Sequence, residues 1–276
     1  MPEVDTFDIE LKLLLEGIFL KYKADFRHYT HASVRRRITL ALTKLHCPTV
    51  SQLQEKVLSS ATIFDQLLQI LTVPTSEMFR DPSYYRALRE EVIPILMTYP
   101  SVKLWIAGCS TGEELYSMAI MLKEEGLLER TIIYATDINP TSLAKAQAGI
   151  FPLDQIKHYT ASYQKAGGKC AFSDYYQAAY GLAIFDQSLR NNVVFADHSL
   201  ATDSVFAEVQ LISCRNVLIY FDRELQNRAF QLFRDSLCHL GYLGLGSKET
   251  LQFSTVTDAF EEAFPRDKIY RRRAKP

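Results

Sequence analysis

The chain has 276 residues, 47% of them hydrophobic and 23% charged, so it can bury one sizeable core, or a core with a small satellite domain. Its formal net charge of −1 gives no reason to expect affinity for nucleic acid or for a membrane surface. Five cysteines without a CxxC pair argue against structural zinc and a disulfide scaffold, and without a leader-like start or a long apolar run we expect a cytoplasmic protein.

Residues 1–90 are predicted to form an N-terminal helical domain. Apolar side chains recur at helical spacing at residues 11–19, 34–45 and 63–71, which is typical of helices with one buried face. A connecting helix is expected at residues 84–92, between two prolines.

Within residues 91–276, apolar runs alternate with helical stretches, which predicts an α/β fold with a doubly wound sheet and right-handed crossovers. Residues 150–191 are rich in Tyr, Gly and Ala and fit this alternation poorly, so we expect an inserted small subdomain there. The expected strands are 104–107, 131–137, 192–197, 209–214 and 241–245, with 268–271 as a last edge strand, and the expected helices are 115–124, 140–148 and 224–237.

A nucleotide-type pocket is predicted after the first of these strands. The strand ends in a turn of small residues, 108–112, and Glu113 and Glu114 then open a helix. A strand, a glycine turn and a helix N-terminus together can hold a nucleotide. Because the chain lacks both the dinucleotide fingerprint and the P-loop motif, a pyrophosphate ligand has little support.

Acidic residues indicate which nucleotide fits. Asp137 ends the second strand, where a carboxylate can accept both hydroxyls of a ribose. With Glu113 and Glu114 nearby, the pocket suits a cationic ligand such as S-adenosylmethionine. Two simpler interpretations stay open: Asp137 can be an ordinary strand-end or capping residue, and the two glutamates can merely complement the helix dipole.

Five sequence motifs now become recognisable in order along the chain. The most distinctive is Cys-Arg-Asn-Val-Leu-Ile-Tyr-Phe at 214–221, and Trp-Ile-Ala-Gly-Cys-Ser-Thr-Gly-Glu-Glu-Leu-Tyr-Ser at 105–117 is the longest. Together they resemble the motifs of CheR-type chemoreceptor glutamate methyltransferases. The other three are residues 71–80 at the domain junction, Ala-Thr-Asp-Ile at 135–138, and Leu-Gly-Leu-Gly-Ser-Lys-Glu at 243–249.

The resemblance implies a Rossmann-like class I S-adenosylmethionine-dependent methyltransferase sheet, an N-terminal all-helical domain and a small inserted β-subdomain. It implies methyl transfer from S-adenosylmethionine to receptor glutamate side chains, with S-adenosylhomocysteine as product and no metal. The residues it matches to the cofactor site are Ser76, Arg80, Glu113, Glu114, Asp137, Ser199, Leu200, Arg215 and Asn216, and those it matches to catalysis are Arg80 and Tyr220.

The implied partner is the helical cytoplasmic domain of a chemoreceptor. The basic run at residues 35–37 would dock on its acidic methylation region, although a solvated helix face explains the run equally well. The insert at about 150–191 would grip a receptor tail, although its aromatic residues can form a small core of their own.

The chemistry needs orientation more than a base. A glutamate carboxylate is already ionised at neutral pH, because its pKa is about 4.3, so no general base is required. Arg80 can hold one substrate oxygen and leave the other free, and Tyr220 can position either reactant. The simpler interpretations are a salt bridge from Arg80 to Glu77 or Asp81, and a half-buried core tyrosine.

The chain departs from the family pattern at three positions. Pro74 and Ser199 stand where the family usually has Asn, and Gln210 replaces a common acid. The changes at Pro74 and Ser199 motivate an alternative, a catalytically weak regulator that binds a nucleotide or S-adenosylhomocysteine and acts through partners. A methyltransferase for a small carboxylic acid is a third interpretation, but such a substrate needs neither a helical docking domain nor an insert.

Overall fold

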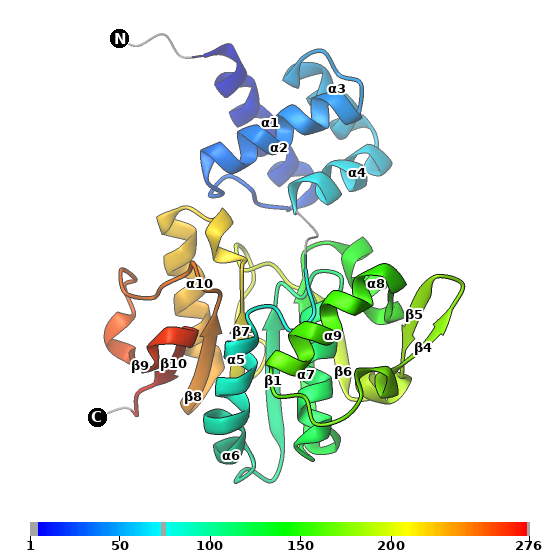
Figure 1. Cartoon of the computed structure of the whole chain (residues 1–276). Coiled ribbons are helices and arrows are strands. Elements are labelled where there is room, and N and C mark those ends of the chain that lie inside the picture. The colour runs from blue at the N-terminus through cyan, green and yellow to red at the C-terminus, as the bar shows by residue number, and fades with distance from the viewer. Residues whose placement is uncertain (1–4, 73–75, 275–276) are drawn as a thin grey trace. The chain divides into compact units, whose positions relative to one another are not determined.

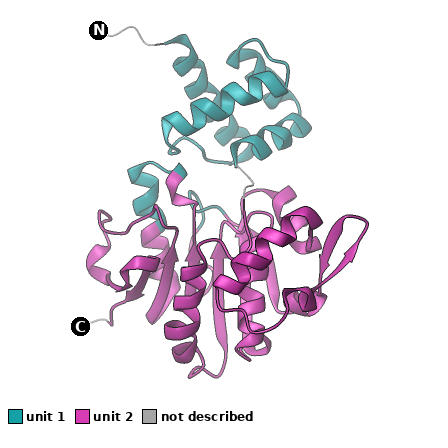
Figure 2. Cartoon of the chain, viewed as in Figure 1, with its two compact units in different colours: residues 1–74, 199–203, 220–229 teal, residues 75–198, 204–219, 230–276 magenta. Residues whose placement is uncertain are grey.

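The structure is a computed structural model that describes residues 5–72 and 76–274. Pro74, one of the departures from the family pattern, lies outside the described residues. The described chain forms two compact units, each with its own buried apolar residues (Figure 2). The first unit consists of the residues up to 72 with 199–203 and 220–229, and the second consists of 76–198, 204–219 and 230–274.

Helices make up the N-terminal part of the first unit (Figure 1). Leu14, Ile18 and Ile38 have no exposed surface, because the apolar stripes of these helices pack against one another. The hydroxyl of Thr49 accepts a hydrogen bond from the Gln52 N–H at 3.2 Å and so caps one helix start. The helices are α1 (Thr6–Tyr22), α2 (His31–Lys44), α3 (Val50–Ser59) and α4 (Ala61–Leu71).

A seven-stranded sheet organises the second unit, in the order β6-β2-β1-β7-β8-β10-β9. The strands from β6 to β8 run parallel to their neighbours, so their carboxyl ends meet at one edge. This confirms the predicted doubly wound sheet. The parallel strands are β1 (Val102–Ala107), β2 (Thr131–Asp137), β6 (Val193–Asp197), β7 (Val209–Cys214) and β8 (Leu237–Leu245).

The C-terminal end of the sheet differs from the sequence prediction. The predicted edge strand corresponds to β10 (Ile269–Arg272), but β10 lies inside the sheet, antiparallel to β8 on one side and to β9 (Phe260–Phe264) on the other. The edge strand β9 was not predicted, since its alternation is interrupted by Glu261 and Glu262, both exposed.

Helices cover both faces of the parallel strands. On one face Leu104 and Ile106 join the buried cluster of α7 (Glu113–Glu124). On the other, the Trp105 ring packs edge-on against Phe233 of α10 (Arg223–Ser236), and its Nε1–H donates to the Thr136 hydroxyl at 2.8 Å. Helix α8 (Pro140–Ala148) follows β2, with the Asn139 side chain as its N-cap.

The connecting helix is longer than predicted. It begins as α5 (Pro82–Ala87), continues as a π-helical turn (Leu88–Val92) and ends as α6 (Ile93–Leu96). Pro94 therefore lies inside the helical stretch and does not end it. The π-helical turn comes directly before this proline, where an α-helical turn would press the ring against an earlier carbonyl.

The predicted insert is a small α/β subdomain between α8 and β6. Its three-stranded antiparallel sheet has the order β3-β5-β4, and α9 (Ile156–Lys165) crosses between the first two strands in sequence. Tyr163, Phe172 and Tyr175 are buried and belong to the main core cluster. The strands are β3 (Ile150–Pro152), β4 (Tyr176–Ala179) and β5 (Leu182–Phe185).

Candidate functional site

The loop after β1 turns sharply on two glycines. Gly108 and Gly112 have φ angles of 77° and 100°, a region that favours glycine. A Cβ at Gly108 would lie 2.5 Å from Val217, and one at Gly112 would lie 2.9 Å from Ala146. These positions therefore need glycine both for the backbone conformation and for the packing that brings this loop against its neighbours.

Asp137, at the end of β2, closes the same loop. Its carboxylate accepts the Ser110 N–H on Oδ2 and the Asn139 N–H on Oδ1, both at 2.9 Å. Burial raises the pKa of this carboxyl, and the backbone donors partly offset the rise. A carboxylate has about four acceptor sites and the Ile138 N–H contributes a third backbone bond, so Asp137 can organise the loop and still accept a hydroxyl group.

Glu113 begins α7 with its carboxylate buried. Thr111 Oγ1 donates to its Oε2 at 2.6 Å, and the Ser76 side chain also hydrogen-bonds to it. Burial raises the pKa of Glu113, and these hydroxyl groups act in the opposite direction. Ser76 and Glu113, both matched to the cofactor site from the sequence, thus lie close to each other in the second unit.

Glu114 faces β7. Its Oε1 accepts the Ser213 hydroxyl at 2.6 Å, and its Oε2 lies 3.8 Å from Arg215 Nη1. Ser213 Oγ is also 2.8 Å from the Tyr84 hydroxyl. This carboxylate is therefore held on a chain of polar side chains from β7 and α5, and about a seventh of its side chain, 15%, stays exposed.

Arg80 lies between two residues in the left-handed region, Phe79 at φ 53° and Asp81 at φ 55°. Within the described chain its guanidinium has no hydrogen bond or ion pair. Both acids that could have neutralised it are engaged elsewhere: Asp81 with Arg215 at 2.7 Å, and Glu77 with His158 at 3.5 Å. Among the described residues, the structure therefore does not contain the local salt bridge from Arg80 to Glu77 or Asp81 that the simpler interpretation expects.

The loop after β7 carries Arg215 and Asn216. Asn216 has φ 61°, and its backbone N–H donates to Glu249 Oε2 at 2.9 Å. Glu249 is buried and also accepts the Gly246 N–H at 2.7 Å. A single carboxylate thus joins the loops after β7 and β8. The Arg215 guanidinium is almost fully enclosed, with 1% of its side chain exposed.

Ser199, Leu200 and Tyr220 belong to the first unit, and their contacts are described within it. The Ser199 N–H donates to Asp203 Oδ2 at 2.9 Å, and Leu200 is buried. The Tyr220 carbonyl accepts the Thr30 N–H at 2.8 Å, beside a bridge between residues 29 and 221. The other residues matched to the site, which are Ser76, Arg80, Glu113, Glu114, Asp137, Arg215 and Asn216, all belong to the second unit.

Three polar residues of this region had no predicted role. Ser213 holds Glu114, Ser117 accepts the Phe79 N–H on its hydroxyl at 2.8 Å, and Glu249 organises Asn216. Glu249 ends a recognised motif, so its sequence position was a usable signal. Ser117 also ends a recognised motif, at 105–117, and so gave a similar signal. Ser213 looks like an ordinary small residue of a strand, and only the packing reveals its partners.

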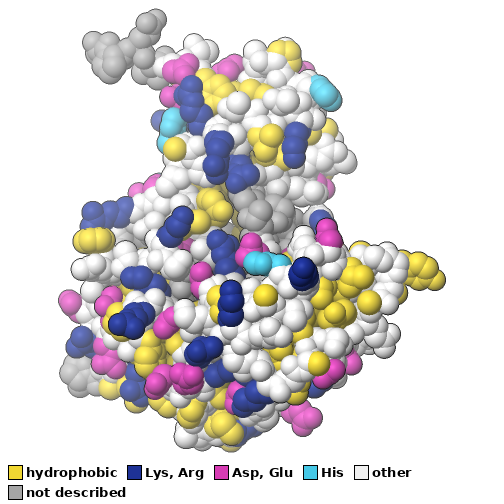
Figure 3. Space-filling view, viewed as in Figure 1, with side chains coloured by type: hydrophobic (Ala, Val, Ile, Leu, Met, Phe, Trp, Pro, Cys, Tyr) yellow, Lys and Arg dark blue, Asp and Glu magenta, His cyan; other side chains and the backbone are white. Residues whose placement is uncertain are grey.

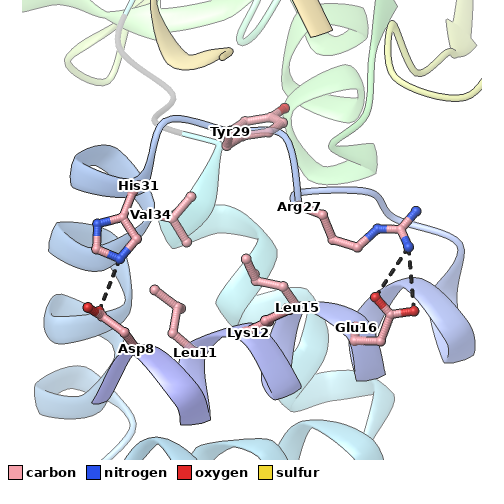
Figure 4. Close-up of a pocket in the computed structure, with 9 residues that line it drawn as sticks. All are labelled: Asp8, Leu11, Lys12, Leu15, Glu16, Arg27, Tyr29, His31 and Val34. Carbon is pink, nitrogen blue, oxygen red and sulfur yellow. Dashed lines mark hydrogen bonds and ion pairs between the residues drawn. The ribbon is translucent and has the colours of Figure 1, made fainter. Parts of the chain in front are cut away.

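A separate cavity of about 340 Å³ lies in the helical part of the first unit (Figure 4). Its apolar wall is formed by Leu11, Leu15 and Val34. Two ion pairs line it, His31 with Asp8 at 3.0 Å and Arg27 with Glu16 at 3.2 Å. Lys12 and Tyr29 complete the lining. None of the predicted site residues borders this cavity.

The polar groups of the second unit fit an uncharged or cationic nucleoside better than a polyphosphate. Asp137, Glu113 and Glu114 present carboxylates at the carboxyl ends of β1 and β2, and Ser110 has a buried hydroxyl without a partner among the described residues. Carboxylates favour ammonium, sulfonium and ribose hydroxyl groups. Within residues 5–72 and 76–274, no cluster of three metal-ligating side chains occurs.

The visible surface shows no field of one sign. Figure 3 shows basic and acidic side chains interspersed over the visible face of each unit. Within the described chain, no helix has the length and apolar character needed to cross a bilayer.

Comparison with known families identifies the family and the class of cofactor. A family model described as "CheR methyltransferase, SAM binding domain" matches residues 74–268, and one described as "CheR methyltransferase, all-alpha domain" matches residues 9–72. This chain belongs to the CheR methyltransferase family. The family resemblance and fold predicted from the sequence are confirmed, and an S-adenosylmethionine-dependent methyltransferase associated with chemotaxis is supported.

Individual relatives agree with the CheR assignment. The Pseudomonas putida protein named "Putative methyltransferase Cher3" is 61% identical over 265 residues, which span 96% of this chain and 97% of that protein. A Listeria innocua chemotaxis protein methyltransferase is 30% identical over 82% of this chain and 84% of its own length. Among solved structures, magnesium protoporphyrin IX methyltransferase from Synechocystis is similar with a TM-score of 0.32 and 17% identity, over 59% of this chain and 55% of that one.

Proposed function

We propose that this protein transfers a methyl group from S-adenosylmethionine to glutamate side chains of chemoreceptor cytoplasmic domains, forming methyl esters. The observation that carries the proposal is the Arg80 guanidinium, which has no protein partner within the described chain, in the same unit as three carboxylates suited to a cationic cofactor. An unpaired guanidinium is a ready partner for a substrate carboxylate.

The carboxylates would hold the cofactor. Asp137 would accept the ribose hydroxyls, while Glu113 and Glu114 would face its cationic part, with Ser76 orienting Glu113. When bound, S-adenosylmethionine supplies an electrophilic methyl group on a sulfonium. We retain Ser199, Leu200 and Asn216 as further candidate contacts of the cofactor, whereas Arg80, which the resemblance also matches to the cofactor site, is assigned here to the substrate. S-adenosylhomocysteine is the expected product.

Arg80 would orient the nucleophile. A substrate glutamate is ionised at neutral pH, since its pKa is about 4.3, so the site needs no base to activate it. One N–H of Arg80 would bind one carboxylate oxygen and leave the other aligned for attack, whereas a bidentate grip would reduce its nucleophilicity. Tyr220 would position either reactant through its hydroxyl.

Two surfaces would engage the receptor. The basic run on α2 would meet the acidic methylation region, but its three residues differ: Arg36 is exposed, whereas Arg35 pairs with Asp5 at 2.6 Å and Arg37 has a buried, unpartnered Nε among the described residues. Arg36 is therefore the first candidate contact. The insert would hold a receptor tail, in addition to contributing aromatic residues to the core.

The test is incubation with methyl-labelled cofactor and a receptor cytoplasmic fragment. Base-labile label on the receptor, absent when its methylation-site glutamates are replaced by alanine, is the expected result. Cofactor binding by calorimetry without any transfer would contradict the proposal and favour the alternative, a regulator that acts through partners. That alternative takes its support from Ser199, whose hydroxyl accepts the Ala201 N–H at 3.2 Å and is thus partly used within its own turn.

A further inference from the structure

The guanidinium of Arg215 binds the loop that carries Arg80. Its Nη2 donates to the Arg80 carbonyl oxygen at 2.9 Å and to Asp81 Oδ2 at 2.7 Å, although these residues lie 135 and 134 positions earlier in the chain. With 1% of the side chain exposed, it has almost no surface left for a ligand to touch. A role in direct contact with the cofactor therefore fits this conformation poorly.

The surroundings of Arg215 fix the orientation of its planar group. The Tyr84 ring lies 4.2 Å from Cζ, and Glu114 Oε2 lies 3.8 Å from Nη1. Both hydrogen bonds to the Arg80 loop come from Nη2, and Nε and Nη1 have no hydrogen-bond partner among the described residues. The planar guanidinium packs on the Tyr84 ring, and lysine lacks the planar group that makes this contact. Arg215 thus connects the Arg80 loop with a carboxylate predicted to bind the cofactor.

The Arg80 loop needs such support because of its backbone conformation. Phe79 and Asp81 both have positive φ angles, and a left-handed conformation is unfavourable for a residue other than glycine. Such a conformation persists only when its surroundings impose it. On one side Ser117 accepts the Phe79 N–H, and on the other Arg215 binds Asp81, so Arg80 is held between two fixed neighbours.

We infer that Arg215 is a positioning residue, which holds the backbone of the Arg80 loop so that the Arg80 guanidinium is presented to the substrate, and that it does not bind the cofactor directly. This inference rests on the proposed function for the role of Arg80. Its structural part, that Arg215 maintains the shape of the loop, stands independently of which substrate Arg80 binds.

The first test compares Arg215→Lys with wild type. We expect kcat for transfer to the receptor fragment to fall by about 30-fold or more, while Kd for S-adenosylhomocysteine changes by less than about twofold. The matched control is Arg89→Lys, because Arg89 is also a buried arginine of the second unit, paired with Glu124 and, at 2.7 Å, with Glu125. It should leave kcat within about twofold of wild type. A tenfold or larger loss of S-adenosylhomocysteine affinity in Arg215→Lys would overturn the inference.

The second test is a double-mutant cycle with Arg80→Ala. If Arg215 acts through Arg80, Arg215→Lys should change the residual rate of Arg80→Ala by less than about twofold. Equal losses in both backgrounds would overturn the inference.

A third measurement is independent of the activity. Amide hydrogen exchange of the peptide covering 76–83 should accelerate in Arg215→Lys and stay unchanged in Arg89→Lys, and unchanged exchange in both would overturn the inference. Failure of the proposed function would instead appear as a wild-type enzyme that does not label the receptor.

Discussion

Two loops of the second unit carry the charged side chains of the proposed site, and they are built in different ways. The loop after β1 is held by its own glycines and by residues of the next strand, such as the bond from Ser110 to Asp137 over 27 positions. The Arg80 loop is held by side chains from distant parts of the chain: Ser117, Arg215 and, around the Phe79 ring, Tyr163 and Phe172.

Because the two loops are held differently, we expect them to respond differently to substitution. In the loop after β1 the functional residues also supply the structural hydrogen bonds, so one change should remove both ligand contact and loop shape. In the Arg80 loop the guanidinium proposed to bind the substrate has no hydrogen bond or ion pair within the described chain, so its position can be changed by substitutions elsewhere. Substitutions of Arg215, and of Tyr163 and Phe172 in the insert, should therefore affect the Arg80 half selectively.

The largest effect is expected for Phe79→Ala. Phe79 is fully buried among Tyr85, Tyr163 and Phe172, with ring centroids 5.1–6.2 Å apart, so truncation should cost about 3–5 kcal/mol of unfolding free energy. Urea denaturation measures this loss. Transfer activity at a temperature where the variant stays folded should also fall.

The control for Phe79→Ala is Phe260→Ala, on the edge strand β9, where Phe260 is also buried. It should be destabilised as well but keep its transfer rate. If the transfer rate fell in both variants in proportion to their loss of unfolding free energy, the packing around Phe79 would have no specific effect on the Arg80 loop.

The next largest effect is expected for Asp137→Ala. Loss of the proposed ribose acceptor and of the bond to Ser110 should weaken S-adenosylhomocysteine binding by about a hundredfold, or about 2.7 kcal/mol. Isothermal titration calorimetry measures the change. Asp186→Ala is the matched control, since Asp186 also accepts a backbone N–H, from Ser188 at 2.7 Å, but lies in the insert. If Asp137→Ala bound S-adenosylhomocysteine with wild-type affinity, Asp137 would not bind the cofactor and the prediction would be wrong.

The smallest effect is a pH dependence centred on Glu113. Its folded pKa is raised above the ordinary value of 4.5 by burial, so its contribution to stability is fully present at low pH and declines as the pH rises through the folded pKa. Glu113→Gln, which has no such titration, should therefore be more stable relative to wild type at about pH 7 than at about pH 4.

Urea midpoints at the two pH values would measure this difference, with the exposed Glu91→Gln as a control that should follow wild type. If the difference in stability between Glu113→Gln and wild type were the same at both pH values, burial would not raise the pKa of Glu113. Glu113→Gln should also bind the cofactor with lower affinity than wild type does.

Much of the fold was predictable because its signals are local. The strands β2 and β7 match their predicted bounds, and α10 differs from its prediction by one residue at each end. The predictions failed where tertiary packing outweighs the local sequence pattern. Strand β9 alternates weakly, and the position of β10 inside the sheet depends on β9. The helical stretch continued past Pro94 because a π-helical turn precedes that proline.

The two halves of the proposed site also differed in how far a local sequence pattern could predict them. Glu113, Glu114 and Asp137 follow from the strand-turn-helix pattern, since the elements that place them are contiguous in sequence or adjacent in the sheet. Arg80 and Arg215 were recognisable only from the family motifs, and the enclosure of Arg215 was not predictable from either motif. Whether a side chain faces a ligand or another loop depends on contacts across 135 positions, which no local pattern contains.

The most direct test of the central claim, that the carboxylates bind the cofactor while Arg80 binds the substrate, is Arg80→Ala measured by two methods on one preparation. Calorimetry should give a Kd for S-adenosylhomocysteine within about twofold of wild type, and transfer to the receptor fragment should fall by about a hundredfold or more. Arg86→Ala, on the neighbouring helix with its guanidinium on the Lys165 carbonyl at 2.7 Å, is the control and should retain activity. An Arg80→Ala protein whose turnover stayed within about twofold of wild type would contradict the assignment.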